Sequence, residues 1–220
     1  MFGGQIEITW ITGRDLEKDL AKTTELGFFN ALTEMGHVVN VYSTTKLIRD
    51  SRYNHKYFKK IRIKGFETLS GSFYLKRKLV RDKNLYNSDC ILIDWRYVVN
   101  LSEMIHKTGI PWYIIDRGPP VYDSILTKIQ KKMWEKSWKI ANEKSQGGFV
   151  VSENHKKLVE KIGINIPIKP LSAGINNSEY KNLRDKDIKD KIDIIYAGRL
   201  DKNRGMENLI KFSRKISKIS

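Results

Sequence analysis

Residues 5–42 read QIEITWITGRDLEKDLAKTTELGFFNALTEMGHVVNVY, and this stretch contains a complete strand, helix and strand. The segment from Gln5 to Thr12 predicts a strand, and apolar residues then recur at helical spacing from Leu26 to Met35. Gly36 is placed to end that helix, and the valine-rich run from Val38 to Tyr42 predicts the next strand. Two strands joined by a helix in this way predict a parallel pair with a helical crossover.

The same alternation continues as far as Leu171. Further strands are predicted at residues 61–63, 90–94, 111–115, 148–151 and 166–171, with helices at 73–86, 101–106, 125–140 and after Ser152, which caps the last of them. The helix at 125–140 is amphipathic, with lysines on one side and Ile125, Leu126, Ile129, Met133 and Ile140 on the other. We therefore expect residues 1–176 to form an α/β, Rossmann-like domain. Its mainly parallel sheet of about seven strands has helices on both faces and binds ligands at the carboxyl ends of the strands.

Length and composition limit the class of protein. A chain of 220 residues predicts one full domain and part of a second, and 40% apolar with 30% charged residues is typical of a globular protein. The sequence contains no stretch long enough to span a membrane, and Glu7 interrupts the first apolar run, so we expect no signal peptide and a cytoplasmic location. Cys90 is the single cysteine, which excludes an internal disulfide and predicts a small core residue.

The net charge of +16 is concentrated in one part of the chain. Between Arg49 and Lys83 there are twelve basic residues against three acidic ones, interleaved with tyrosine and phenylalanine. This mixture suits an anionic membrane surface or a nucleic-acid backbone, and the alternative is a solvated lysine-rich face. Because no short nucleic-acid-binding signature is present, nucleic acid is the less favoured partner.

A second strand-to-helix turn follows near the end of the chain. Residues 192–200 read IDIIYAGRL and predict a buried strand, and a tight turn then leads to a helix that begins at Met206. Arg199 and Arg204 flank this turn, where backbone N–H groups and a helix N-terminus suit a phosphate. The pattern indicates either a diphosphate clamp or an ordinary turn with two solvated arginines. Residues 177–191 predict a linker, and 192–220 predict the first strand and helix of a truncated second domain.

Four motifs in this order resemble the retaining glycosyltransferases of the GT-B fold, in the group-1 or family-four class. They are Gly36-His37-Val38-Val39-Asn40-Val41, Phe149-Val150-Val151-Ser152-Glu153, Pro170-Leu171-Ser172-Ala173-Gly174-Ile175-Asn176, and Ala197-Gly198-Arg199-Leu200 with Arg204-Gly205. The resemblance implies two Rossmann-like domains that face a cleft. The first domain mainly holds the acceptor and the second holds the nucleotide sugar.

The resemblance also assigns the donor side of the site. Arg199 and Arg204 match the basic pair that binds the donor diphosphate, although the second position is usually lysine in the family. Their charge stabilises the departing nucleoside diphosphate, so the resemblance implies neither a metal nor another cofactor. Gly13 corresponds to a glycine-containing loop that approaches the donor phosphate and the acceptor, but the usual Gly-Gly pair is missing.

On the acceptor side, the polar residues that the resemblance makes available are Arg14, Asp15, Lys22 and Arg117. Asp116 falls where many relatives place a histidine near the transferred sugar, and it is the candidate catalytic residue. It either hydrogen-bonds a sugar hydroxyl or caps the loop onto Arg117.

The expected function follows from these matches. The resemblance implies a hexosyltransferase-type enzyme that transfers a sugar from a nucleotide sugar to an acceptor. A lipid-linked acceptor at the cytosolic face of a membrane would explain the basic charge between Arg49 and Lys83. Because the family's second-domain glutamate pair, spaced seven residues apart, has no counterpart after Gly205, we expect this chain alone to be inactive. A homodimer that forms through the truncated second domain would cover the exposed surface of that domain. The alternatives are a non-catalytic membrane-surface module with a degenerate transferase fold and, less favoured, a nucleic-acid-binding domain.

Overall fold

The computed structural model describes residues 4–19, 22–46, 51–63, 65–120, 125–174, 196 and 205–216. The chain divides into two compact units, Met1–Asn176 and Asn177–Ser220. In the second unit the structure describes Tyr196, Gly205 and helix α7 (Met206–Ile216). The linker at 177–191, most of the strand at 192–200, and both Arg199 and Arg204 lie outside the described residues, and what was inferred for them stays a prediction.

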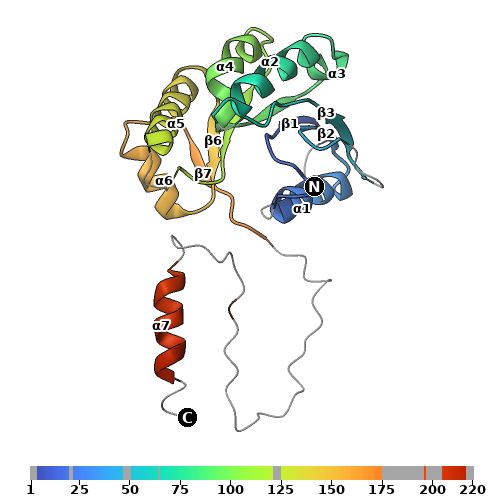
Figure 1. Cartoon of the computed structure of the whole chain (residues 1–220). Coiled ribbons are helices and arrows are strands. Elements are labelled where there is room, and N and C mark those ends of the chain that lie inside the picture. The colour runs from blue at the N-terminus through green and yellow to red at the C-terminus, as the bar shows by residue number, and fades with distance from the viewer. Residues whose placement is uncertain are drawn as a thin grey trace. The chain divides into compact units, whose positions relative to one another are not determined.

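The first unit is built on one sheet whose seven strands lie in the order β3-β2-β1-β4-β5-β6-β7 (Figure 1). The strands are β1 (Glu7–Ile11), β2 (Val38–Ser43), β3 (Asn54–Tyr57), β4 (Cys90–Asp94), β5 (Trp112–Asp116), β6 (Gly147–Val150) and β7 (Ile168–Pro170). Every neighbouring pair is parallel. The predicted α/β, Rossmann-like fold is therefore confirmed.

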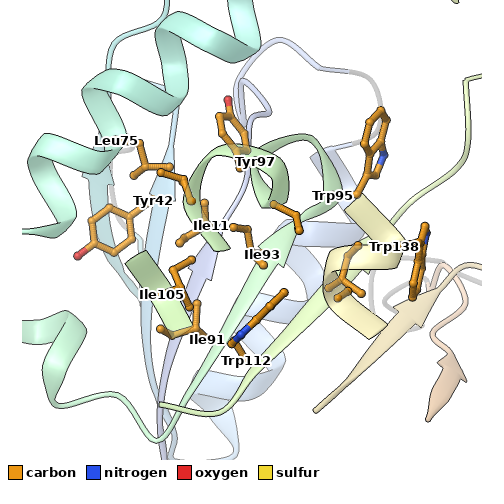
Figure 2. Close-up of a cluster of buried hydrophobic side chains, with 14 of the residues drawn as sticks. Ile11, Tyr42, Leu75, Ile91, Ile93, Trp95, Tyr97, Ile105, Trp112 and Trp138 are labelled. Atoms are coloured by element: carbon orange, nitrogen blue, oxygen red, sulfur yellow. The ribbon is translucent and has the colours of Figure 1, made fainter. Parts of the chain in front are cut away.

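Helices cover both faces of this sheet, as the alternation predicts. The helices are α1 (Lys22–Glu34), α2 (Glu67–Leu79), α3 (Lys83–Tyr86), α4 (Trp95–His106), α5 (Ile125–Lys144) and α6 (Glu153–Glu160). On one face α4 lies between α2 and α5, and the larger core forms beneath them around Ile93, Leu101 and Trp138 (Figure 2). On the other face α1 packs its Phe29 edge-on to Trp10, with ring centroids 5.1 Å apart.

Three predicted elements differ from the observed ones. The helix predicted at 101–106 begins earlier, at Trp95, because Asp94 caps α4. The third strand was predicted at 61–63, which was wrong, because β3 forms at Asn54–Tyr57. Its polar side chains bond to those of β2: Asn54 Nδ2 donates to Asn40 Oδ1 at 3.1 Å. The helix predicted at 73–86 is two helices, since Asp82 caps α3 by accepting from the Asn84 N–H.

The buried side of α5 also differs from the prediction. Ile125 is 81% exposed and Ile129 52% exposed, whereas Trp134 and Trp138 are buried. Both indole N–H groups bond to a carboxylate at the end of β5, which orients the helix by hydrogen bonding as well as by apolar burial. Of the predicted apolar side, Ile125 and Ile129 were therefore wrong, whereas Leu126 and Met133 are partly buried.

Candidate functional site

A cavity of about 390 Å³ opens at the carboxyl ends of β1, β4 and β5. The residues that follow these three strands form most of its wall. Lys60, from the segment after β3, the first turn of α2 and the middle of α5 complete it. This is the edge at which parallel α/β sheets bind their ligands. The location therefore agrees with the expectation from the alternating pattern.

Gly13 follows β1 and lies directly under the ring of Tyr97. A Cβ atom at Gly13 would lie 2.7 Å from Cε2 of Tyr97, and one at Gly71 would lie 3.1 Å from its Oη, so the ring fits between two glycines. The Gly13 carbonyl accepts a hydrogen bond from Lys60 Nζ at 3.0 Å. Burial lowers the pKa of Lys60, and the Glu67 carboxylate opposes that shift. Gly13 thus has a packing role at the cavity wall, and its predicted contact with phosphate stays a prediction.

Arg14 lines the cavity and is held by two acids. Its Nε donates to Glu25 Oε1 at 3.0 Å, and its Nη1 donates to Asp19 Oδ2 at 3.1 Å. Glu25 is buried, and among the described residues its Oε2 has no hydrogen-bond partner. Burial raises the pKa of Glu25 to about 7, although the neighbouring Arg14 lowers it. The Arg14 guanidinium is therefore positioned by the protein before any ligand binds.

Asp15 and Lys22 do not line the cavity. Asp15 Oδ2 accepts from Arg62 Nη2 at 3.3 Å, and its Oδ1 accepts from the Glu17 N–H at 3.2 Å. Lys22 Nζ donates to the Glu17 carbonyl. Both residues hold the loop between β1 and α1, and their acceptor-side roles stay predictions.

The segment at residues 94–96 places a third cation at the cavity, after Arg14 and Lys60. Asp94 ends β4 and caps α4, because its Oδ1 accepts from the Arg96 N–H at 2.9 Å. The Arg96 Nη1 donates back to both oxygens of Asp94, at 3.0 and 3.3 Å. Its guanidinium lies over the Trp95 ring, 4.9 Å from the centroid. The carboxylate of Asp94 raises the pKa of Arg96 further, so this cation is permanent.

Asp116 ends β5 and is completely buried. Its Oδ2 accepts from the indole N–H of Trp138 at 2.8 Å and from that of Trp134, and it lies 3.1 Å from His155 Nε2. Its Oδ1 accepts from the Gly118 N–H at 2.9 Å. Burial favours a higher pKa, but these hydrogen bonds hold the pKa of Asp116 below its ordinary value.

A sugar hydroxyl that bonds to Asp116 would have to reach a fully buried carboxylate. The catalytic role of Asp116 therefore stays a prediction. The loop is capped at Gly118, while Arg117 turns away and its Nη1 donates to the Leu171 carbonyl at 3.1 Å. Arg117 also lies over the ring of Phe28, 6.0 Å from its centroid. Burial lowers the pKa of Arg117, and Glu25 opposes that shift. Arg117 does not line the cavity, but its charge interacts with those of Glu25 and Arg14 behind the cavity wall.

Sequence reasoning missed Lys60, Trp95 and Arg96 as site residues. Trp95 and Arg96 immediately follow a predicted strand, and that position was the available signal. Lys60 carried no such signal, since it lies 47 residues from the carbonyl that it bonds.

Some site types find no support in the part of the chain that the structure describes. There, no group of three or more His, Cys, Asp or Glu side chains is arranged to hold a metal ion. Within the same residues, no helix has both the length and the apolar character needed to cross a bilayer. Burial raises the pKa of the Cys90 thiol, which disfavours the reactive thiolate.

No protein-family model matches the sequence, and no curated protein matches it. Solved structures match at the level of the fold. UGT2 from Phytolacca americana, complexed with UDP-2-fluoro-glucose and pterostilbene, has 11% identity and a TM-score of 0.56 over 81% of this chain and 56% of its own. CalG4, the calicheamicin glycosyltransferase, has 9% identity and a TM-score of 0.50 over 82% and 56% of the two chains. A UGT transferase from Siraitia grosvenorii in complex with UDP has 10% identity and a TM-score of 0.50 over 80% and 53%.

These similarities show the fold. The first unit has the Rossmann-like α/β architecture of the GT-B glycosyltransferases, and the chain spans about half the length of the matched structures. At this level of identity the retaining mechanism and the family-four class remain predictions.

Proposed function

We propose that this chain is the acceptor-binding part of a glycosyltransferase that uses a nucleotide-sugar donor. The observation that carries the proposal is the cavity at the carboxyl ends of β1, β4 and β5, where Arg14, Lys60 and Arg96 converge. The fold supports it, since structures of the same architecture are described as complexes with UDP-2-fluoro-glucose and with UDP. The order of the sequence motifs supports the retaining, hexosyltransferase-type class.

The cavity is suited to an acceptor that carries both hydroxyl and anionic groups. Carboxylates of Asp19 and Glu67 accept hydrogen bonds from hydroxyls, and Lys60 and Arg96 attract an anion such as the phosphate of a lipid-linked acceptor. Trp95 adds an aromatic surface beside them. We place this acceptor at the cytosolic face of a membrane.

The donor is assigned to the second domain of the complete enzyme. In the proposed reaction the bond from the anomeric carbon to the diphosphate oxygen breaks and the acceptor oxygen bonds to that carbon. The proton of the acceptor hydroxyl passes to the departing diphosphate. Arg199 and Arg204 neutralise the charge that develops on the departing nucleoside diphosphate, without a metal.

The donor assignment is tested in the complete enzyme with Arg199→Ala and Arg204→Ala. Each substitution removes charge-assisted hydrogen bonds of roughly 1.5–3 kcal/mol, so UDP affinity by calorimetry should fall roughly ten- to a hundredfold. Lys211→Ala, an exposed position on α7, is the matched control and should leave affinity unchanged. Unchanged UDP affinity in both arginine variants would mean that Arg199 and Arg204 are solvated side chains of an ordinary turn and do not bind the diphosphate.

The acceptor assignment is tested with Arg96→Ala in the complete enzyme. The assay is release of nucleoside diphosphate from UDP-glucose, UDP-N-acetylglucosamine and GDP-mannose in the presence of a lipid extract. We expect a lower kcat/KM for the acceptor and an unchanged affinity for the donor.

The second candidate function is a non-catalytic membrane-surface module, which is favoured by exposed apolar side chains on α2. No release with any donor, together with intact binding to lipid vesicles, would select that candidate.

A further inference from the structure

Helix α2 is apolar on the side that faces solvent. Phe66, Leu69, Phe73 and Val80 are 55–60% exposed, and their spacing places them along one side of a helix. The residues of α2 that are buried against the domain, among them Leu75 and Leu79, lie on another side. A surface helix ordinarily turns charged and polar residues to water, so a row of four large apolar side chains indicates a binding surface.

Cations border this apolar row. Lys76 and Arg77 lie on the same exposed side, and Arg81 follows the helix. Together with Phe73 and Val80 they line a hollow on the surface of α2. The Arg77 guanidinium lies over the Phe73 ring, 5.6 Å from its centroid. Apolar side chains that point outward between fixed cations match the interface of an anionic bilayer, which offers acyl chains beneath negative headgroups.

The apolar row begins at the rim of the cavity. Glu67 and Thr68, in the first turn of α2, line the cavity, and Phe66 and Leu69 are their exposed neighbours. Helix α5 approaches the same place, because Leu126 Cδ1 would lie 3.7 Å from a Cβ atom at Gly65. Two further exposed apolar side chains, Ile125 and Ile129, lie in the first turns of α5.

We propose that the outer side of α2, formed by Phe66, Leu69, Phe73, Lys76, Arg77 and Val80, inserts into the headgroup region of an anionic membrane and brings the cavity rim to the lipid surface. The inference is independent of the proposed glycosyl transfer, because it rests on the exposure and charge of α2. It assigns membrane binding to one helix side rather than to the basic character of the whole chain.

Insertion is tested with a fluorophore at the centre of the row. Phe73→Cys in a Cys90→Ser background carries one environment-sensitive dye, and Met35→Cys in the same background is the control, since Met35 is also exposed but lies at the end of α1. With vesicles of phosphatidylcholine containing one third phosphatidylglycerol, we expect a blue shift and quenching by nitroxide lipids at position 73 only. Absence of a shift at position 73, or an equal shift at position 35, would overturn the proposal.

The electrostatic part is tested by vesicle sedimentation of the chain at low and high salt. Replacing Lys76, Arg77 and Arg81 by glutamine should weaken binding on the order of a hundredfold at low salt, because each cation near a membrane adds about 1 kcal/mol. Equal affinity of the unaltered chain for neutral vesicles would contradict it.

A matched variant removes the same charge elsewhere, with Lys157, Lys161 and Lys169 replaced by glutamine. It should bind vesicles within about threefold of the unaltered chain, because these lysines lie outside the α2 surface. Leu69→Gln with Phe73→Ser should weaken binding on the order of tenfold, since less apolar area enters the bilayer. Light scattering shows whether the unaltered chain forms a concentration-dependent dimer. If it does, and the double variant is monomeric, the outer side of α2 binds a second copy of the chain and not lipid.

Discussion

Neighbouring strands β4 and β5 both end in an aspartate, and the two carboxylates have opposite surroundings. Asp94 lies opposite Ile115 in the ladder, one position from Asp116. Asp94 pairs with the half-exposed Arg96 at the cavity, whereas Asp116 is enclosed by two indoles and an imidazole. The same residue type at the same edge of a sheet thus holds a cavity-lining arginine in one strand and belongs to the core in the next.

The helices that follow explain the difference. Helix α4 begins directly after Asp94, so that carboxylate caps the helix and its arginine remains beside the cavity. After Asp116 the chain passes through a proline-containing loop before α5 returns over the end of the strand. Trp134, Trp138 and His155, on α5 and α6, then cover the carboxylate. The end of a strand therefore fixes where an aspartate lies in the sheet. The elements that pack over that end decide whether its carboxylate is beside the cavity or in the core.

The largest effect should come from Asp116→Ala. This substitution leaves buried indole and imidazole donors without their acceptor, so we expect the free energy of unfolding to fall by about 3–5 kcal/mol. Asp94→Ala is the matched control and should cost about 0.5–2 kcal/mol, the usual value of a lost helix cap. Urea denaturation measures both. Equal losses in the two variants would remove the distinction between the two strand ends.

In acid, the unaltered chain and Asp116→Ala should become closer in their free energies of unfolding. Because the pKa of Asp116 is lower in the folded protein, its ionised form contributes stability above its unfolded pKa of about 3.9. That contribution is lost as the pH falls through the lower folded value. The gap in unfolding free energy between the unaltered chain and Asp116→Ala should thus shrink in strong acid. A gap that widens in acid would show that the carboxyl is stabilised in its protonated form.

Gly13→Ala should have a smaller effect at the end of β1. The new Cβ would lie 2.7 Å from the Tyr97 ring, so overpacking should cost about 1–3 kcal/mol. Combining it with Tyr97→Leu should cost less than the sum of the two single changes, because the clash is removed. Strictly additive losses in urea denaturation would mean that the ring and the glycine are not in contact.

Arg96→Ala should have the smallest effect on stability. Because the Arg96 side chain is 43% exposed, its ion pair with Asp94 should contribute less than about 1 kcal/mol. The melting temperature, measured by circular dichroism, should therefore change little, in contrast to Asp116→Ala. A loss as large as that of Asp116→Ala would assign Arg96 to the fold rather than to the site.

Several features of the fold were predictable because they depend on neighbours in the sequence. The run from Val38 to Tyr42 became β2, Gly36 adopts a positive φ of 91° just after α1, and Ser152 caps α6 through the His155 N–H. Cys90 is only partly buried, so its prediction as a core residue was approximate. Strand β3 escaped prediction because its polar side chains are satisfied by β2, which no hydropathy pattern records.

The sequence by itself determined the alternation of strands and helices, the parallel sheet that follows from it, and the edge of the sheet at which the cavity opens. These depend on local periodicity and on the handedness of crossovers, both of which are written in consecutive residues. Only the tertiary structure decided which charged groups meet there: Lys60 reaches the Gly13 carbonyl, and Asp116 turns away into the core. The reason is physical, since the surroundings of a charged side chain depend on elements that pack against it from distant parts of the chain.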